Sequence, residues 1–177
     1  IELVKVDLGT KKTEKGEDYR KVNPHGYVPA LQLDSGEVLT EGPAIVQYLA
    51  DKSPETRIVP ANGTTERYKQ QQWLNHIGTE LHKGMGSLFN EDMAKAAGGM
   101  IKSKLADRLA ELDMHLAGKD YIMGKQFTAA DAYAFTILGW GKHVGVDVEK
   151  HPNVKAFMAR VGSRPKVQEA LKAEGLV

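Results

Sequence analysis

The sequence of 177 residues contains no cysteine. Without a thiol the chain can form no disulfide, offers no thiolate to a metal and has no cysteine nucleophile. It also lacks any apolar run near the ~20 residues that a membrane-spanning helix needs, and its first residues lack the basic-then-apolar pattern of a secretory signal. These absences predict a soluble, cytoplasmic protein whose chemistry depends on other side chains.

Neither sign of charge dominates the composition. The 24 Lys and Arg residues are balanced by 23 Asp and Glu residues, and the two kinds alternate along the chain. Binding to a polyanion depends on clustered basic side chains that displace counterions, so nucleic acid is not an expected partner. With 41% hydrophobic residues the chain can bury a sizeable core, in one domain or in two small ones.

The hydrophobic period changes once along the chain. Up to about Asp51, short alternating runs predict strands, whereas from Thr65 onward apolar residues recur at spacings of three and four, which predicts helices. Between them lies a cluster of helix and strand breakers: Ser53, Pro54, Pro60, Asn62 and Gly63. We therefore predict an α/β domain over residues 1–51, a linker over 52–63 and an all-helical domain over 64–177.

Residues 22–51 carry the strongest local signals. Asn23–Gly26 is typical of a turn, and two alternating runs flank Asp34–Gly36, which predicts a hairpin. Gly42 and Pro43 then begin a predicted helix. Proline costs nothing at the first helical position, because the N–H that it lacks would have no partner there.

This segment resembles the glutathione-binding half of the cytosolic glutathione transferases, and it is most similar to their bacterial beta class. The resemblance covers essentially the whole chain and rests on these motifs: Asn23-Pro24-x-Gly26-x-Val28-Pro29-Ala30-Leu31, Leu39-Thr40-Glu41-Gly42-x-Ala44-Ile45-x-x-Tyr48-Leu49 and Thr79-Glu80-Leu81-His82-Lys83-Gly84. It implies a thioredoxin-like α/β domain followed by an all-α bundle. It also implies a homodimer that transfers the glutathione thiolate to small electrophiles, as in detoxification, with glutathione as co-substrate and no metal.

The resemblance also implies how the first domain holds glutathione. In the family the Val-Pro bond is cis and the valine backbone pairs with the cysteinyl residue of glutathione, a role that falls on Val28 and Pro29. The free N–H groups at the helix start near Gly42 and the carboxylate of Glu41 would hold the γ-glutamyl group. Taken singly, Val28-Pro29 could merely shape a turn and Glu41 merely cap a helix.

Two further positions in the first domain follow from the same resemblance. Many family members have serine where this chain has Gly42, so we expect weaker or differently balanced binding of glutathione. Lys11 falls where a family lysine reaches the glycyl carboxylate, although Lys12 takes that place if the register shifts by one. The alternative for both lysines is a solvated loop.

The second domain begins with a predicted helix from about Thr65 to Phe89. Its core stripe consists of Leu74, Ile77, Leu81, Met85 and Leu88. The resemblance implies that Asn75 and Glu80 reach the γ-glutamyl group across a dimer interface, that His82 and Lys83 line the sulfur pocket, and that Met85, Phe89 and Trp140 line the substrate pocket. The alternatives are a surface or hydrogen-bonded histidine at position 82 and plain core aromatics. His76 and His82 are six apart, so they do not form a zinc pair on one helical face.

Further helices follow from local signals. Gly98-Gly99 is expected to separate two helices, the second running from Met100 to Ala117. Thr128 and Asp131 form an Asp variant of the capping box and should start a buried helix. His151-Pro152 and Arg164-Pro165 should each begin another helix.

The first residues predict a strand, Ile1–Val6, that starts without a lead-in. In the resembling family a strand and a helix precede this point and carry the residue that contacts the glutathione sulfur. We therefore expect the sequence to be a fragment, or the domain to be completed by another segment. Two function classes stay open at this level: a glutathione-dependent enzyme, and a non-catalytic interaction or regulatory module with the same fold.

Overall fold

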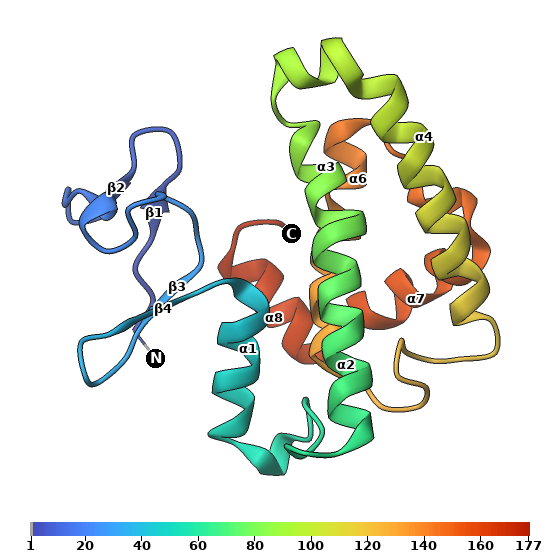
Figure 1. The fold of residues 1–177 in the computed structure, drawn as a ribbon, viewed down its shortest axis with the longest axis horizontal. Coiled ribbons are helices and arrows are strands. Elements are labelled where there is room, and N and C mark those ends of the chain that lie inside the picture. The colour runs from blue at the N-terminus through green and yellow to red at the C-terminus, as the bar shows by residue number, and fades with distance from the viewer. Residues whose placement is uncertain (1) are drawn as a thin grey trace. The chain divides into compact units, whose positions relative to one another are not determined.

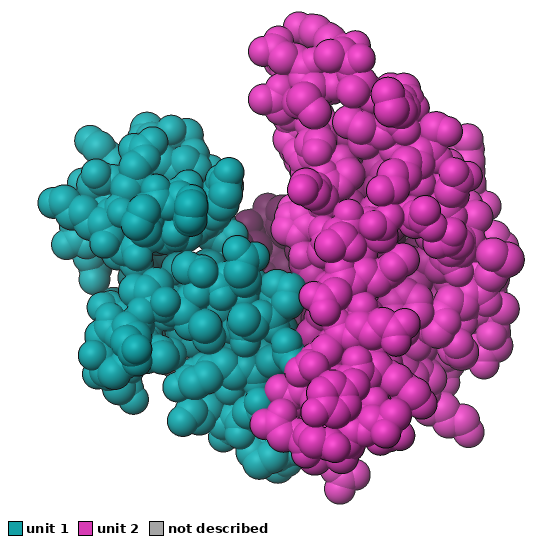
Figure 2. Space-filling model, viewed as in Figure 1, with its two compact units in different colours: residues 1–55 teal, residues 56–177 magenta. Residues whose placement is uncertain are grey.

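The computed structural model describes residues 2–177, which form two compact units: residues 1–55 and residues 56–177 (Figures 1 and 2). Unit 1 combines short strands with one α-helix, and the regular elements of unit 2 are helices joined by loops. The predicted fold class, a small α/β domain followed by a helical domain, is confirmed. No helix within residues 2–177 is both long and apolar enough to cross a membrane.

Unit 1 contains two separate antiparallel pairs of strands. Strand β1 (Val6–Asp7) pairs with β2 (Lys12–Thr13), and β3 (Ala30–Gln32) pairs with β4 (Val38–Thr40). A short 3-10 helix, η1 (Tyr19–Lys21), connects the two pairs. The second pair confirms the hairpin predicted around Asp34–Gly36.

Helix α1 (Gly42–Asp51) follows β4 directly and has proline in its first turn, as expected. It packs against both strands of the second hairpin and buries Ile45 and Ala50. The helix thus begins at the edge of the hairpin, and this position places its first N–H groups beside the loop that leads into β3.

The strand predicted over Ile1–Val6 is wrong for most of its length. The ladder begins at Val6, residues 2–5 are irregular, and Ile1 lies outside the described residues. A strand persists only where a neighbour continues its ladder of hydrogen bonds. The β2 partner is two residues long, so β-branched composition alone does not hold residues 2–5 in a sheet.

Unit 2 is a bundle of helices (Figure 1). Its elements are η2 (Pro54–Thr56, at the boundary), α2 (Thr65–His76), the π-helix η3 (Ile77–His82), α3 (Lys83–Ser87), α4 (Glu91–Leu116), α5 (Ala129–Gly139), α6 (Gly141–Val144), η4 (Val148–Lys150), α7 (Pro152–Gly162) and α8 (Pro165–Ala173). The helix starts predicted at Pro152 and Pro165 are confirmed. The linker role of residues 52–63 stays a prediction. Within unit 2, the carbonyls of Ile58 and Pro60 accept hydrogen bonds from Gln70, Ala129 and Arg67.

The helix predicted over Thr65–Phe89 is interrupted. A π-helical turn, η3, lies between α2 and α3, and the Lys83 N–H bonds to the Gly78 carbonyl five residues earlier. The predicted core stripe is nevertheless confirmed, since all five of its side chains are buried: Leu74, Ile77, Leu81, Met85 and Leu88. π-Helical turns are rare and occur frequently at functional sites.

The break expected at Gly98-Gly99 is wrong. Helix α4 runs through both glycines, and Gly98 is buried next to the Leu88 side chain. A helical glycine costs only about 1 kcal/mol relative to alanine, which packing of a long helix can offset. The helix begins at Glu91 and is capped by Asn90, whose side chain accepts from the Met93 N–H.

Helix α5 begins with the predicted capping box. The fully buried carboxylate of Asp131 accepts from the Thr128 N–H at 2.7 Å, the Thr128 hydroxyl at 2.9 Å and the Ile122 N–H at 2.7 Å. Burial raises the pKa of Asp131, and these hydrogen bonds act in the opposite direction. Asp131 therefore satisfies two buried backbone donors that have no water to replace it.

We predict that Asp131→Asn lowers the free energy of unfolding by about 1–3 kcal/mol, the cost of leaving a buried donor unsatisfied. An amide accepts through its oxygen only, so its NH₂ group must face one of the two backbone N–H groups. Urea unfolding followed by circular dichroism measures the change. The control is Asp107→Asn on the exposed side of α4, and an equal effect of the two substitutions would contradict the role of Asp131.

Candidate functional site

The loop before β3 is fixed at one carbonyl. The backbone carbonyl of Tyr27 accepts from the Tyr19 hydroxyl at 2.7 Å and from the Asn23 side-chain amide at 2.8 Å. Tyr19 and Asn23 are both buried, 5% and 4% exposed. The turn residue Asn23 was apparent from the sequence, but Tyr19 was missed. The signal available for Tyr19 was a lone aromatic residue inside a charged stretch.

This anchored loop presents the backbone of Val28. The Val28-Pro29 peptide bond is cis, as the resemblance implied, and Val28 is 46% exposed. Within residues 2–177 no group hydrogen-bonds to the N–H or the carbonyl of Val28. An exposed and unpaired peptide unit beside a strand can bind an extended peptide by strand addition.

The start of α1 lies against the same loop. A side chain at Gly42 would place its Cβ 3.8 Å from the Pro29 ring, which is ordinary van der Waals contact. The first helical N–H groups that do have partners, those of Ala44 and Ile45, both bond to the Glu41 carbonyl. In the described part of the chain the Gly42 N–H has no partner. It is therefore a free donor at a helix N-terminus, a place where anions bind readily.

Glu41 does not cap this helix. Its φ of 67° and ψ of 111° are rare for a residue with a side chain, and its carboxylate makes no capping hydrogen bond to α1. The simpler alternative for Glu41, an ordinary helix cap, is therefore excluded. A backbone held in a sparsely populated region costs about 1–3 kcal/mol and is typical of binding and catalytic residues.

Lys11, and not Lys12, lies next to the Val28 loop. The Lys11 side chain packs over Gly26, and its ammonium donates to the Gly26 carbonyl at 3.0 Å. Lys12 belongs to β2 and is exposed. Of the two registers left open by the sequence, the structure places Lys11 beside the cis loop.

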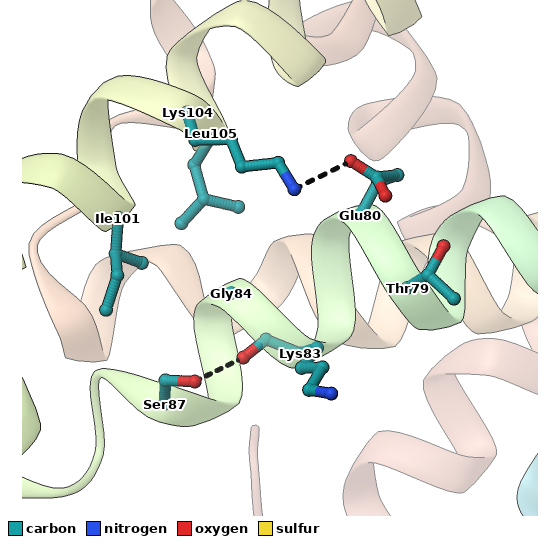
Figure 3. A pocket seen from close by; sticks show the side chains of 8 residues that line it. All are labelled: Thr79, Glu80, Lys83, Gly84, Ser87, Ile101, Lys104 and Leu105. Atoms are coloured by element: carbon teal, nitrogen blue, oxygen red, sulfur yellow. Dashed lines mark hydrogen bonds and ion pairs between the residues drawn. The ribbon is translucent and has the colours of Figure 1, made fainter.

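In unit 2 the predicted site residue Glu80 already has charged partners. Glu80 forms an ion pair with Lys104 of α4 at 3.1 Å (Figure 3). It forms a second ion pair with Arg108 of the same helix, also at 3.1 Å. The hydrogen bond from Lys104 lowers the pKa of the Glu80 carboxyl. Glu80 and Lys83 line a small hollow of about 170 Å³ between α3 and α4. The sequence did not single out Lys104 or Arg108, since each is one of many charges on a helix.

Asn75 and Lys83 are exposed. Asn75 lies on α2, and its backbone carbonyl accepts from the Thr79 hydroxyl at 3.1 Å. Lys83 is the first residue of α3, directly after His82. The roles that the resemblance implies for Asn75, Glu80 and Lys83 stay predictions.

His82 is held within an aromatic cluster. Its Nδ1 lies 2.6 Å from the Tyr133 hydroxyl, and its ring meets the Trp140 ring edge-on at 4.8 Å between centroids. The Phe89 ring in turn contacts Trp140 at 5.6 Å. His82 is thus neither free on the surface nor buried in the core, and no sequence motif indicated its partner Tyr133, 51 residues away.

A hollow of about 970 Å³ opens beside this cluster, within unit 2. Its walls are largely apolar and include Phe89, Phe135, Trp140, Met158, Leu171 and Val177. The size is at the upper end for a pocket that holds a small organic molecule. Phe89 and Trp140 both border this apolar cavity, and their role in binding a substrate stays a prediction.

Met85 is not part of that hollow. It is fully buried in the core of unit 2, at one-turn spacing from Leu81 and Leu88. The expectation that Met85 lines a substrate pocket needs this correction. Met85 continues the core stripe on α3, whereas the hollow is bordered by Phe89, which follows that helix.

Comparisons with known proteins agree with this architecture. The family model of the glutathione S-transferase N-terminal domain matches residues 1–52, and the model of the C-terminal domain matches residues 79–165. The fold of an α/β unit followed by a helical unit is therefore that of a glutathione transferase. This chain belongs to the glutathione S-transferase family.

Bacterial members of the family are similar over nearly the whole chain. Glutathione S-transferase GstA of Escherichia coli O157:H7 is 46% identical over 174 residues, covering 98% of this chain and 87% of that protein. A ternary complex of BphK, a bacterial glutathione transferase, is 50% identical with a TM-score of 0.96, covering 99% and 88% of the two chains. A sphingomonad glutathione S-transferase complexed with glutathione is 45% identical with a TM-score of 0.92, covering 98% and 87%.

The backbone at Glu41 yields a stability prediction. Because glycine adopts positive φ without a steric cost, Glu41→Gly should leave the free energy of unfolding unchanged or raise it by up to about 1 kcal/mol. The control Glu17→Gly, at an exposed loop residue whose φ is not positive, should lower it by about 0.5–1 kcal/mol. Both are measured by urea unfolding. A clear loss of stability in Glu41→Gly would show that the carboxylate, against expectation, supports the fold.

Proposed function

We propose that this protein is a glutathione transferase that binds glutathione and transfers its thiolate to small electrophiles, as in detoxification. The observation that carries the proposal is the combination at the Val28 loop: an unpaired peptide unit, an adjacent free N–H at the start of α1 and a glutamate that does not cap the helix. These groups complement a short peptide that carries a free carboxylate and an ammonium group.

Each part of glutathione has a proposed partner in unit 1. The cysteinyl backbone pairs with Val28, and its approach depends on the cis bond to Pro29. The γ-glutamyl carboxylate binds the Gly42 N–H at the positive end of the helix dipole, and Glu41 accepts from the ammonium. Lys11, whose ammonium already bonds to Gly26, is the proposed partner of the glycyl carboxylate.

Catalysis in this proposal means stabilising negative sulfur. A free thiol ionises with a pKa of about 8.5, so at neutral pH most glutathione is not the nucleophilic thiolate. His82 as a hydrogen-bond donor and Lys83 as a cation would favour the ionised form. The electrophile would occupy the apolar hollow beside Phe89 and Trp140.

The alternative, a non-catalytic interaction or regulatory module, has less support. Relatives that cover nearly the whole chain at 45–50% identity are described as glutathione transferases, one of them with glutathione bound. A docking module would not need an unpaired Val28 backbone or a glutamate held at positive φ. The two classes are separated by a conjugation assay with an excess of a generic aromatic electrophile, in which a module shows no rate above that of free glutathione.

Glu41 gives the first test of the binding site. Glu41→Gln should weaken glutathione binding by about 1–3 kcal/mol, the range for a lost charge-assisted hydrogen bond. Isothermal titration calorimetry measures the affinity, with Glu17→Gln as the control for a distant carboxylate in the same unit. Unchanged affinity in Glu41→Gln would remove this residue from the site.

Gly42 gives a test of opposite sign. A serine side chain fits there, because its Cβ would meet Pro29 only at ordinary contact distance and the backbone is not at positive φ. Gly42→Ser adds a hydroxyl beside the proposed carboxylate position and should tighten glutathione binding by about 0.5–1.5 kcal/mol, one net hydrogen bond. The same titration measures it, and weaker binding in this variant would place the γ-glutamyl group elsewhere.

We also propose that the active species is a homodimer in which Asn75 and Glu80 contribute to the partner's site. Members of symmetric dimers bury the same patch on both copies, and these two residues lie on neighbouring turns of α2 and η3. Sedimentation velocity should give one species of twice the chain mass. A monomer that binds glutathione at full affinity would refute the proposal.

A further inference from the structure

The hydrogen bond between His82 and Tyr133 is short. The Tyr133 oxygen lies 2.6 Å from Nδ1 of His82. Bonds from an N–H donor to oxygen cover about 2.7–3.2 Å, so this contact is shorter than expected if the imidazole N–H donated to the tyrosine oxygen. A phenol hydroxyl can donate, and an unprotonated imidazole nitrogen can accept. The distance therefore favours the hydroxyl as donor and the ring nitrogen as acceptor.

The direction of this bond decides the tautomer of the histidine. A neutral imidazole carries one proton, and a nitrogen that accepts a hydrogen bond cannot carry it. If Nδ1 of His82 accepts from Tyr133, the proton is on Nε2. Nε2 is then a hydrogen-bond donor at the far side of the ring.

The surroundings also fix the plane of the ring. The Trp140 and Tyr133 rings meet the imidazole at interplanar angles of 79° and 77°, so two aromatic side chains of α5 and its C-cap limit its rotation. His82 ends the π-helical turn η3, which packs against α5. Both the position and the orientation of the imidazole thus depend on α5.

We propose that Tyr133 is a positioning residue for His82. Its hydroxyl donates to Nδ1, holds the proton of the neutral imidazole on Nε2 and so presents an Nε2–H donor to the glutathione sulfur. The inference rests on the proposed function, because the sulfur is the group that this donor would serve. Tyr133 itself need not contact glutathione.

The direct test is the tautomer of His82 in the purified protein. Long-range ¹H–¹⁵N correlation spectra of the imidazole groups distinguish a protonated from an unprotonated ring nitrogen, and His82→Gln identifies the signals of His82. We expect Nε2 protonated and Nδ1 unprotonated, with the Nδ1 signal displaced in Tyr133→Phe. A proton on Nδ1, or an Nδ1 signal that does not respond to Tyr133→Phe, would overturn the proposal whether or not the protein conjugates glutathione.

A double-mutant cycle tests whether Tyr133 acts through His82. Tyr133→Phe should lower kcat for conjugation by about 3- to 10-fold, the effect of one neutral hydrogen bond, and leave the affinity for glutathione unchanged. In a His82→Gln background the same substitution should change kcat less than 2-fold, since its target is gone. Tyr68→Phe, at an exposed tyrosine of α2, is the control.

The outcomes separate the two proposals. An equal loss from Tyr133→Phe in both backgrounds would mean that Tyr133 acts by itself, and it would overturn the positioning role but not the function. No conjugation by the unmodified protein would overturn the proposed function, while the spectra would still report the direction of the hydrogen bond. A loss of glutathione affinity in Tyr133→Phe would also contradict the proposal, because the Nε2–H donor acts on charge at sulfur.

Discussion

The buried carboxylate of Asp131 is the contact on which the helical unit depends. It binds the Ile122 and Thr128 N–H groups and starts α5 in a fixed direction. Tyr133 is the fifth residue of that helix, and Trp140 lies at its C-terminal end. The side chains that surround His82 are therefore carried by one helix whose start has a single stable arrangement. The Asp131 carboxylate is costly to bury, but its hydrogen bonds hold the start of α5, and with it the side chains near His82, in one position.

In unit 1 a backbone group with hydrogen-bond partners lies next to one without them. Near its binding loop, the Tyr27 carbonyl has two buried donors, whereas the next residue, Val28, has an unpaired peptide unit. The satisfied group fixes the loop, and the unsatisfied one is left for a ligand. The same contrast recurs at α1, where Glu41 carries backbone strain and leaves its carboxylate free of any role in capping. Unpaired backbone groups and strained backbone conformations of this kind are typical of binding sites.

The failed predictions have two physical causes. The glycine pair Gly98-Gly99 favours a break, yet the packing of α4 on its neighbours outweighs an unfavourable propensity of about 1 kcal/mol per residue. The run over residues 1–6 favours a strand, yet the paired strand begins only at Val6, and among residues 2–5 it is the Lys5 backbone that bonds to the neighbouring segment, through Glu14. Met85 fits a pocket by analogy, yet its spacing from Leu81 assigns it to the core. In the first two cases the outcome was decided by packing or pairing with other elements, whereas the core position of Met85 follows from its local spacing within the stripe.

The sequence by itself determined the features that depend on nearby residues. These include the turn at Asn23, the hairpin, the proline-led helix starts, the core stripes and the capping box, and its motifs identified the family together with Val28, Glu41 and Lys11 as candidates. Only the tertiary structure decided which groups remain unpaired, that Glu41 does not cap α1, that η3 is π-helical, and that Tyr133 bonds to His82 across 51 residues. Periodicity and local hydrogen bonding are encoded within a few residues, whereas the partner of a side chain depends on how whole elements pack.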